Sequence, residues 1–158
     1  MKKSLMEHRI TQIMEAMTSS ISEVMESMFF MPADIGPEAL FKDAQINPND
    51  ALACRLSFTG DISGNLVIVS PDSLVSELAS NFMGESKDQL SWEQQCGTLT
   101  EMLNMVCGNA LRKIKSKLPF ALGLPEMIAC TDLNDTLECQ LIEIMDERLA
   151  LILTMDAA

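Results

Sequence analysis

Two long segments of this chain repeat their apolar residues every three or four positions, and this period constrains the fold more than any other feature. One segment runs from about residue 5 to residue 30, and the other runs from residue 91 to about residue 117. Such a spacing brings apolar side chains to one face of a helix, so we expect two long amphipathic helices. Each helix must bury its apolar face against another layer. The apolar positions of the first helix are Ile10, Ile13, Met14, Met17, Ile21, Val24, Met25 and Met28.

The ends of both helices carry sequence signals. The first helix is followed by prolines and a glycine in residues 32–37, which predict a loop that continues through residues 47–50. The second helix begins at Ser91, and Gln94 stands three residues later, the spacing of a capping box. Prolines and a glycine in residues 119–125 indicate that the second helix has ended by then.

A shorter helix is expected between the two long ones. Ser70 and Pro71 predict its start, with the serine as N-cap and the proline at the first helical position. Gly84 predicts its end, because glycine readily adopts the left-handed conformation that closes many helices.

Strands are predicted in the rest of the chain. Residues 54–59 alternate apolar and polar side chains, glycines bracket a turn at 60–64, and residues 66–69 form an apolar return strand. Three further strands are expected at 126–131, 136–144 and 148–155. Antiparallel strands combined with long helices predict an α+β fold, in which a mostly antiparallel sheet is covered on one face by the helices. The length of 158 residues suits one domain, residues 1–158.

The net charge of −12 excludes a typical nucleic-acid-binding protein, which needs a basic stripe for the phosphate backbone. The densest basic group is Arg112, Lys113, Lys115 and Lys117. We expect this group in the last turns of the second long helix, where positive charge stabilises the helix dipole. That structural interpretation is favoured over phosphate binding.

Several other classes of protein are disfavoured. No apolar run approaches the roughly 20 residues of a membrane span, and the first residues lack the apolar stretch of a secretory signal. The five cysteines show no CxxC spacing and His8 is the only histidine, so neither a zinc site nor a Ser-His-Asp or Cys-His catalytic group is expected. Free thiols fit a reducing compartment, and we expect a cytoplasmic protein.

One polar face of the second long helix is the candidate functional site. Glu101 and Asn104 lie on the side opposite the apolar stripe, about one turn apart. Gly97 and Gly108 lie on the same face, where the absence of a side chain leaves room for another backbone. Taken alone, an exposed glutamate and asparagine on a helix are ordinary surface residues. The functional interpretation therefore depends on the surrounding pattern.

That pattern resembles the CheC/CheX family of chemotaxis phosphatases. The resemblance lies in Glu101-x-x-Asn104, followed by Met105, Gly108 and then Leu124-Pro125, and in the hairpin Gly60-Asp61-Ile62-Ser63-Gly64 before an apolar strand. A single ExxN helix is closer to the CheX branch than to the CheC branch, which usually carries two copies. The first helix holds a faint echo, with Glu23 at the place of Glu101 and Glu26 at the place of Asn104.

The resemblance implies both a substrate and a mechanism. The substrate would be the aspartyl phosphate of a CheY-like response regulator, with Mg²⁺ supplied by that partner and no cofactor held by this chain. Asn104 would orient the attacking water, and Glu101 would pair with a lysine of the receiver domain. Gly97, Gly108 and Met105 would contact the partner. Hydrolysis of an activated acyl phosphate needs mainly positioning and charge stabilisation, which agrees with the residue types present.

Two alternatives stay open beside an active phosphatase. Gly97 stands where the family often has Asp or Ser, and the first helix lacks the asparagine, so the chain could bind a receiver without hydrolysing it. It could also be a structural or dimerisation domain in which the pair has no role. The resemblance implies a homodimer that forms through the sheets, and the strand at 148–155 is a candidate edge for that contact.

Overall fold

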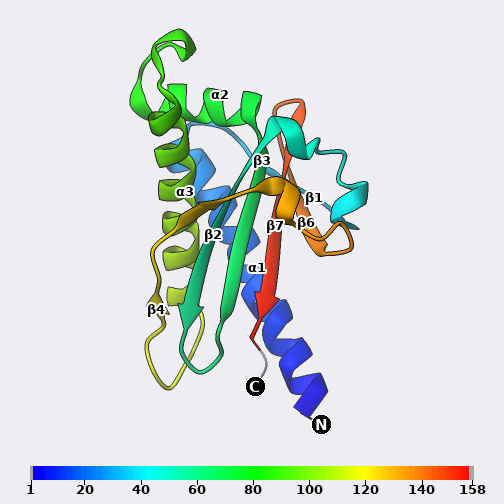
Figure 1. Cartoon of the computed structure of the whole chain (residues 1–158). Coiled ribbons are helices and arrows are strands. Elements are labelled where there is room, and N and C mark those ends of the chain that lie inside the picture. Colours follow the sequence, from blue (N-terminus) through cyan, green and yellow to red (C-terminus); the bar gives the residue numbers. More distant parts are fainter. Residues whose placement is uncertain (1, 157–158) are drawn as a thin grey trace.

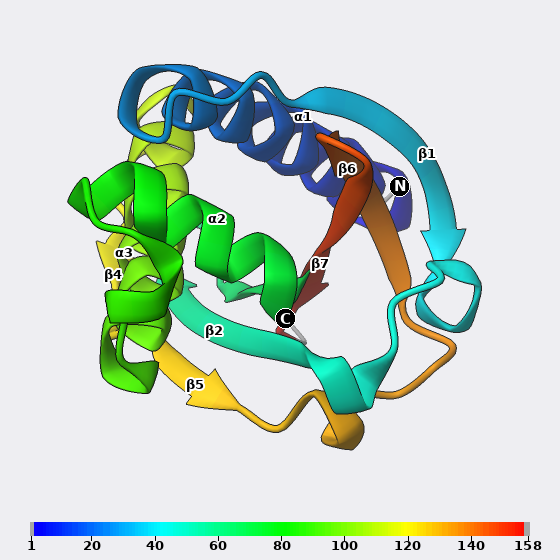
Figure 2. The same cartoon turned by 90° about the horizontal axis from the view of Figure 1, so that it is seen from above.

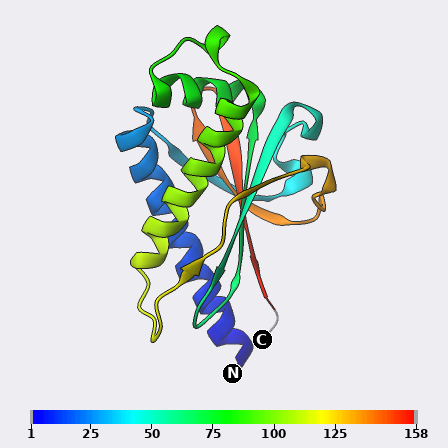
Figure 3. The same ribbon diagram turned by 60° about the vertical axis from the view of Figure 1, so that its left-hand side comes forward.

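The computed structural model describes residues 2–156, of which residues 2–4 are described by their backbone alone. The two apolar repeats form the helices α1 (Lys2–Met28) and α3 (Trp92–Arg112). They run side by side in opposite directions against one face of the sheet (Figures 1 and 3). The shorter helix α2 (Asp72–Met83) lies across one end of the sheet (Figure 2). The predicted layering of helices on a sheet is therefore confirmed.

The sheet has seven strands, and every pairing in it is antiparallel. Its order is β1-β6-β7-β3-β2-β4, and β5 also pairs with β2. The strands are β1 (Asp34–Leu40), β2 (Ala51–Thr59), β3 (Gly64–Pro71), β4 (Ala121–Leu122), β5 (Glu126–Ile128), β6 (Glu138–Ile144) and β7 (Glu147–Met155). The mostly antiparallel α+β architecture expected from the sequence is confirmed.

Two hydrophobic cores lie on the two faces of this sheet. The larger core joins the inner faces of α1, α2 and α3 to the sheet, and Met17, Leu56 and Leu103 are completely buried in it. The smaller core lies on the opposite face and includes Phe41 and Val69. Short 3-10 turns, not a long helix, contribute residues to the smaller core. The long helices therefore cover one face only, as predicted.

Residues 34–40 were expected in a loop, and that expectation is wrong. They form β1, which pairs with β6 along the margin of the sheet. The register shifts between Ile35 and Glu38, around Gly36 and Pro37. Proline can be accommodated there because an edge strand leaves one side of its backbone without a ladder partner. The free edge of β6 therefore decided the conformation of a segment with turn-forming residues.

The start of α2 also differs from the prediction. Ser70 is buried at the end of β3, where its hydroxyl donates to the Pro71 carbonyl, so it is not the N-cap. Pro71 is the N-cap instead, and Asp72 is the first residue of the helix. The negative charge of Asp72 interacts favourably with the helix dipole there. The predicted end is confirmed, since Gly84 has a φ of 68° and donates its N–H to the Ser80 carbonyl.

Helix α3 ends at Arg112, not at Lys117 as predicted. The chain turns there, and the Asp61 carboxylate accepts the Lys117 backbone N–H at 2.6 Å. Lys115 and Lys117 consequently lie beyond the helix. Arg112 and the C-cap residue Lys113 are therefore at the helix end, where their charge stabilises the helix dipole. The rest of the basic group is not placed to do so.

The C-terminal strand is also placed differently from the expectation. β7 lies between β6 and β3, inside the sheet, so the hypothesis that it forms an exposed edge is wrong. Its alternating residues face the two cores on either side. None of the helices within residues 2–156 combines the length and the apolar content needed to cross a membrane.

Candidate functional site

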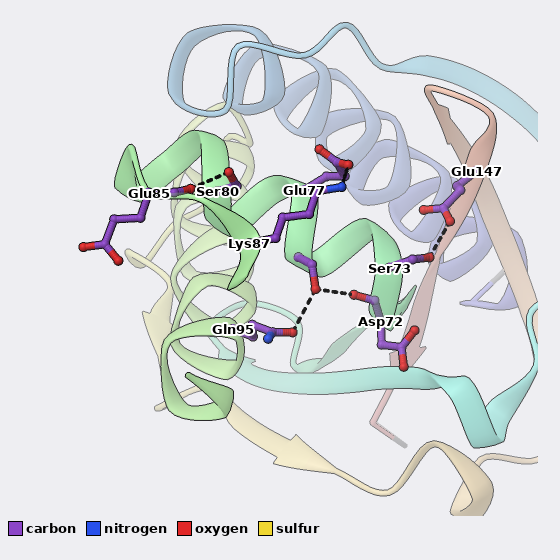
Figure 4. Close-up of polar contacts among 9 residues, drawn as sticks. Asp72, Ser73, Glu77, Ser80, Glu85, Lys87, Gln95 and Glu147 are labelled. Atoms are coloured by element: carbon purple, nitrogen blue, oxygen red, sulfur yellow. Dashed lines mark hydrogen bonds and ion pairs between the residues drawn. The ribbon is translucent and has the colours of Figure 1, made fainter. Parts of the chain in front are cut away.

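Helix α3 carries the candidate site, and its start is held firmly in place. The predicted capping box is confirmed: Ser91 Oγ accepts the Gln94 N–H at 3.1 Å, and Gln94 Oε1 accepts the Ser91 N–H at 2.8 Å. One residue later, Gln95 Oε1 accepts a hydrogen bond from Ser76 Oγ of α2 at 3.1 Å. Figure 4 shows Gln95 directed from α3 toward α2. These bonds fix the position of α3 at the end where the sheet meets α2.

Helix α2 is anchored in turn by polar contacts along its exposed side. Ser73 donates to the Glu147 carboxylate at the start of β7, and Glu77 forms an ion pair with Lys87 in the segment that leads to α3 (Figure 4). Helix α2 is therefore tied both to the sheet and to the connection that leads to α3.

The inner face of α3 is apolar and fully packed. It presents a row of side chains to the sheet and to α1, each almost completely excluded from solvent. The row consists of Leu99, Met102, Leu103, Val106, Cys107, Ala110 and Leu111. Because this face is committed to the core, the opposite face of the helix must point outward.

The sequence-predicted pair lies on that outward face. Glu101 is exposed and Asn104 is partly exposed. Within residues 2–156, neither side chain takes part in a hydrogen bond or an ion pair. Other polar side chains of the helix do bond within the chain: Thr100 Oγ1 donates to the Gly97 carbonyl and Asn109 Nδ2 donates to Glu23 Oε2. The structure therefore brings Glu101 and Asn104 together on one face with their polar groups available.

The two glycines of α3 have little contact with the rest of the chain. A methyl group added at Gly97 would meet no heavy atom within 4 Å, and one added at Gly108 would meet only Leu122 Cδ1, at 3.7 Å. Glycine inside a helix costs about 1 kcal/mol relative to alanine. The packing of the chain gives no reason for glycine at either position.

Met105, the third residue predicted to contact a partner, is partly buried. It packs against the larger core and lines a shallow groove between α1 and α3 together with Glu23 and Asn109. Its contribution to the fold is thus established by its contacts, while contact with a partner stays a prediction.

The echo of the pair on α1 has a structural role. Glu23 Oε1 accepts from Lys113 Nζ at 2.8 Å, and Glu23 Oε2 accepts from Asn109 Nδ2 at 2.9 Å. The hydrogen bond from Lys113 and the one from Asn109 hold the pKa of the Glu23 carboxyl below its usual value. This glutamate connects α1 to the end of α3 and is not free for a partner.

The buried thiols are poor candidates for nucleophiles. Burial raises the pKa of both Cys54 and Cys107 to about 12, so almost no thiolate forms at neutral pH. Residues 2–156 contain no group of three or more His, Cys, Asp or Glu side chains arranged to hold a metal ion.

A second surface feature adjoins the site and was not identified from the sequence. We call it the α3–β4 groove: a depression of about 400 Å³ whose lining includes Gly108, Arg112, Phe120 and Leu122. The apolar run Leu122-Gly123-Leu124 could have revealed it. This run follows a loop and is too short for a strand that would bury its leucines. Gly108 belongs to both the outward face of α3 and this groove.

Comparisons with known proteins agree with this architecture. The chain resembles the crystal structure of the chemotaxis protein CheX from Vibrio vulnificus, with a TM-score of 0.75, 18% identity, and coverage of 91% of this chain and 99% of that one. A CheC-like superfamily protein from Shewanella sp. PV-4 has a TM-score of 0.70 and 18% identity, covering 92% of this chain and 98% of that one. No curated protein sequence shows a significant match.

A third solved structure is a complex. It is the CheX-CheY-BeF3-Mg²⁺ complex from Borrelia burgdorferi, with a TM-score of 0.70, 16% identity, and coverage of 91% of this chain and 97% of that chain. These likenesses confirm the CheC/CheX-like fold. The family described as "Chemotaxis phosphatase CheX" matches residues 52–146, which contain α2, α3 and five of the seven strands in whole or nearly so. Since that match spans more than half of the sequence, this chain belongs to the CheX family of chemotaxis phosphatases.

Proposed function

We propose that this chain hydrolyses the aspartyl phosphate of a CheY-like response regulator, in chemotaxis or in another two-component pathway. The observation that carries the proposal is the pair Glu101 and Asn104 on the outward face of α3, whose side chains bond to no other group within residues 2–156, in a chain of the CheX family. The Borrelia burgdorferi relative is itself recorded in complex with CheY, BeF3 and Mg²⁺, which favours a receiver domain as the partner here.

The proposed reaction needs only modest chemistry from this chain. An aspartyl phosphate is an activated acyl phosphate, so acceleration of its hydrolysis comes mainly from the placement of the attacking water and from charge stabilisation. The Asn104 amide would enter the receiver's active site and hold the water in line with the phosphorus. Asparagine is not a base, and loss of the water's proton to solvent or phosphate suffices. Mg²⁺ bound by the receiver would neutralise charge on the phosphoryl oxygens.

Glu101 has a different role in this proposal. Its exposed carboxylate would pair with a lysine beside the phosphorylated aspartate and set the register of α3 on the receiver. A charge-assisted hydrogen bond of this kind is stronger than a neutral one. Gly97 and Gly108, which the chain's own packing does not require, would let the receiver backbone approach on both sides of the pair.

A second candidate function is a receiver-binding module without catalysis. The observation that favours it is Gly97, because a small glycine stands at a position one turn before Glu101 where a side chain could have contributed a further contact. The two functions predict the same partner and differ only in whether phosphate is released.

The test is a phosphatase assay on phosphorylated receiver domains of the same organism, with Asn104→Ala beside Asn109→Ala. We expect Asn104→Ala to lower kcat about a hundredfold, the usual effect of removing a positioned polar group from a reaction centre. Asn109 lies on the same helix but bonds to Glu23, so its variant should keep the parent rate. Equal rates for Asn104→Ala and the parent would refute the water-positioning role. Tight binding without phosphate release by the parent would favour the binding module.

We also propose that the chain forms a homodimer through its sheet, in the cytoplasm. β1 is the candidate edge, since it pairs only with β6 and exposes Ile35. Light scattering after size exclusion should report twice the chain mass for the parent. Ile35→Lys should shift that mass toward the monomer, and an unchanged mass would exclude this edge.

A further inference from the structure

The α3–β4 groove continues the face on which Glu101 and Asn104 stand. Gly108 follows Asn104 by one helical turn, and its missing side chain forms part of the groove wall. The opposite wall comes from the chain that follows α3, chiefly Phe120 and Leu122. A partner that covers Asn104 would therefore also lie over the adjoining groove.

The far wall of the groove is held firmly against the sheet. Phe120 packs edge-to-face on Phe58 of β2, with ring centroids 6.1 Å apart. A methyl group at Gly60 would stand only 2.7 Å from the Phe120 ring, so the glycine is needed to seat it. Leu122 pairs with Phe58 in the β2–β4 ladder, and the Gly123 N–H donates to the Ser57 carbonyl at 2.7 Å. The groove is therefore preformed by packing and backbone bonds.

The chain segment that supplies the far wall of the groove carries exposed leucines, one in the lining and two that flank it in sequence. Leu118 is 64% exposed, Leu122 is 38% exposed and Leu124 is 91% exposed, and they lie within seven residues of each other. Single exposed leucines need no explanation, but a cluster beside a groove is typical of an interaction surface.

The charged side chain in the groove lining is positive, whereas the chain as a whole is acidic. Arg112 lines the groove, is exposed, and makes no ion pair within residues 2–156; its Nε donates only to the Gly108 carbonyl, at 3.3 Å. Lys115 and Lys117 are exposed nearby. In a chain of net charge −12, this is a local positive site beside an apolar surface.

A phosphorylated receiver has the matching chemistry. Its phosphoryl group carries about −2 charge. The Mg²⁺ beside that group must be held by oxygen ligands, chiefly carboxylates. The phosphoryl oxygens and these carboxylates make the surface around a phosphorylated aspartate acidic, even though Mg²⁺ offsets part of the charge. Arg112, two helical turns beyond Asn104, would face the margin of that surface once Asn104 is inserted.

We propose that the receiver domain makes a second contact in the α3–β4 groove, placing an apolar side chain between Gly108 and Leu122 while one of its carboxylates pairs with Arg112. This inference rests on the proposed function, because it takes the receiver as the occupant of the Glu101 and Asn104 face. A second copy of this chain fits less well. A two-fold symmetric contact through the groove would bring Arg112 of both copies together.

The test uses two variants that alter the groove and leave the core intact. Leu122→Thr makes the far wall of the groove smaller and polar; Leu122 is 38% exposed, and threonine suits its place in a strand. Arg112→Glu reverses the charge, and Arg112→Gln serves in its place if reversal at the helix end impairs folding. Lys42→Glu is the matched control, since Lys42 is exposed on the 3-10 turn after β1.

Two quantities are measured for each variant: KM and kcat for phosphorylated receiver, and Kd for receiver loaded with Mg²⁺ and beryllium fluoride. We expect Leu122→Thr and Arg112→Glu to raise KM and Kd about tenfold, equivalent to 1.4 kcal/mol, with kcat within about twofold of the parent. The effect of Arg112→Glu should shrink at high salt because the contact is electrostatic. Lys42→Glu should match the parent.

The outcomes separate this inference from the proposed function. Unchanged KM and Kd in both groove variants, with a parent that hydrolyses and an inactive Asn104→Ala, would overturn the groove contact alone. A parent that binds but does not hydrolyse would overturn catalysis, and the groove would still be judged by Kd. A change in self-association with unchanged receiver binding would make the groove a contact between copies and refute the proposal. A parent that binds no receiver would overturn both.

Discussion

Helices α1 and α3 lie side by side on the same sheet, yet their glutamates are used in opposite ways. On α1, Glu23 is occupied by Lys113 and Asn109 of the neighbouring helix. On α3, Glu101 bonds to no side chain within residues 2–156 and stands beside the equally unbonded Asn104. The glutamate of α1 therefore connects two helices of the fold, whereas the glutamate of α3 is left available.

The two helices also differ in their glycines. α3 contains Gly97 and Gly108 on its outward face, whereas α1 contains no glycine. Both helices, however, bury apolar side chains in the larger core. The difference teaches that the outer surface of α3 has features that stability does not explain, and that α1 serves mainly as its support.

The largest effect should come from the shared inner layer. Ile21→Ala on α1 and Leu103→Ala on α3 each remove a completely buried side chain, and each should lower the free energy of unfolding by about 3 kcal/mol. Urea unfolding followed by circular dichroism measures both. A cost below about 1 kcal/mol for either one would show that the two helices do not contribute equally to the core.

The next effect concerns the outward glutamates. Glu101→Gln should reduce kcat/KM for phosphorylated receiver about thirtyfold, from loss of a charge-assisted bond worth about 2 kcal/mol, without a change in stability. Glu26→Gln, an exposed glutamate at the place on α1 that corresponds to Asn104, should leave both quantities unchanged. If the two variants behaved alike in the phosphatase assay, the distinction between the helices would fail.

A smaller effect, with opposite signs for stability and function, is expected at Gly97. Gly97→Ala should stabilise the chain by about 0.5–1 kcal/mol, because alanine is the better helix former and the site is open. The same variant should raise KM for the receiver. Ser19→Ala on the exposed side of α1 should give a smaller stabilisation and no change in KM. A Gly97→Ala variant with the parent KM would show that the partner does not need this space.

The smallest effect should come from Glu23. Its folded-state pKa lies below the ordinary value of 4.5, so its ionised form stabilises the folded chain above that pH. The contribution is lost as pH falls through the lowered pKa. Glu23→Gln should therefore be slightly less stable than the parent at pH 7, and the difference should disappear in acid and shrink in salt. A difference that persists in acid, below the lowered pKa of Glu23, would mean that packing, and not charge, is responsible.

Much of the fold could be predicted from local signals. The three-and-four period predicted α1 and α3, the Ser91 and Gln94 capping box predicted the start of α3, and Gly84 predicted the end of α2. These signals act within one or two turns of chain, so neighbouring residues alone reveal them.

Several predictions from the sequence are wrong where contacts with distant parts of the chain determine the local conformation. Residues 34–40 carry turn-forming residues but become β1 because β6 offers an unpaired edge. α3 stops at Arg112, and the Asp61 carboxylate, far away in sequence, holds the chain beyond it. β7 has the alternation of an edge strand but pairs on both sides. For the two strands, backbone hydrogen bonds to remote segments outweighed local preference, and beyond α3 a remote side chain holds the chain.

The sequence by itself determined that Glu101 and Asn104 face away from the core, because the helical period leaves no other orientation once the apolar face is buried. Only the tertiary structure decided that Glu23 is engaged and Glu101 is not, since Asn109 and Lys113 reach Glu23 from a helix that is distant in the chain. Likewise, only the tertiary structure placed Phe120 and Leu122 beside Gly108 to form the α3–β4 groove. Local periodicity fixes the direction in which a side chain points, and the packing of remote elements decides what it meets there.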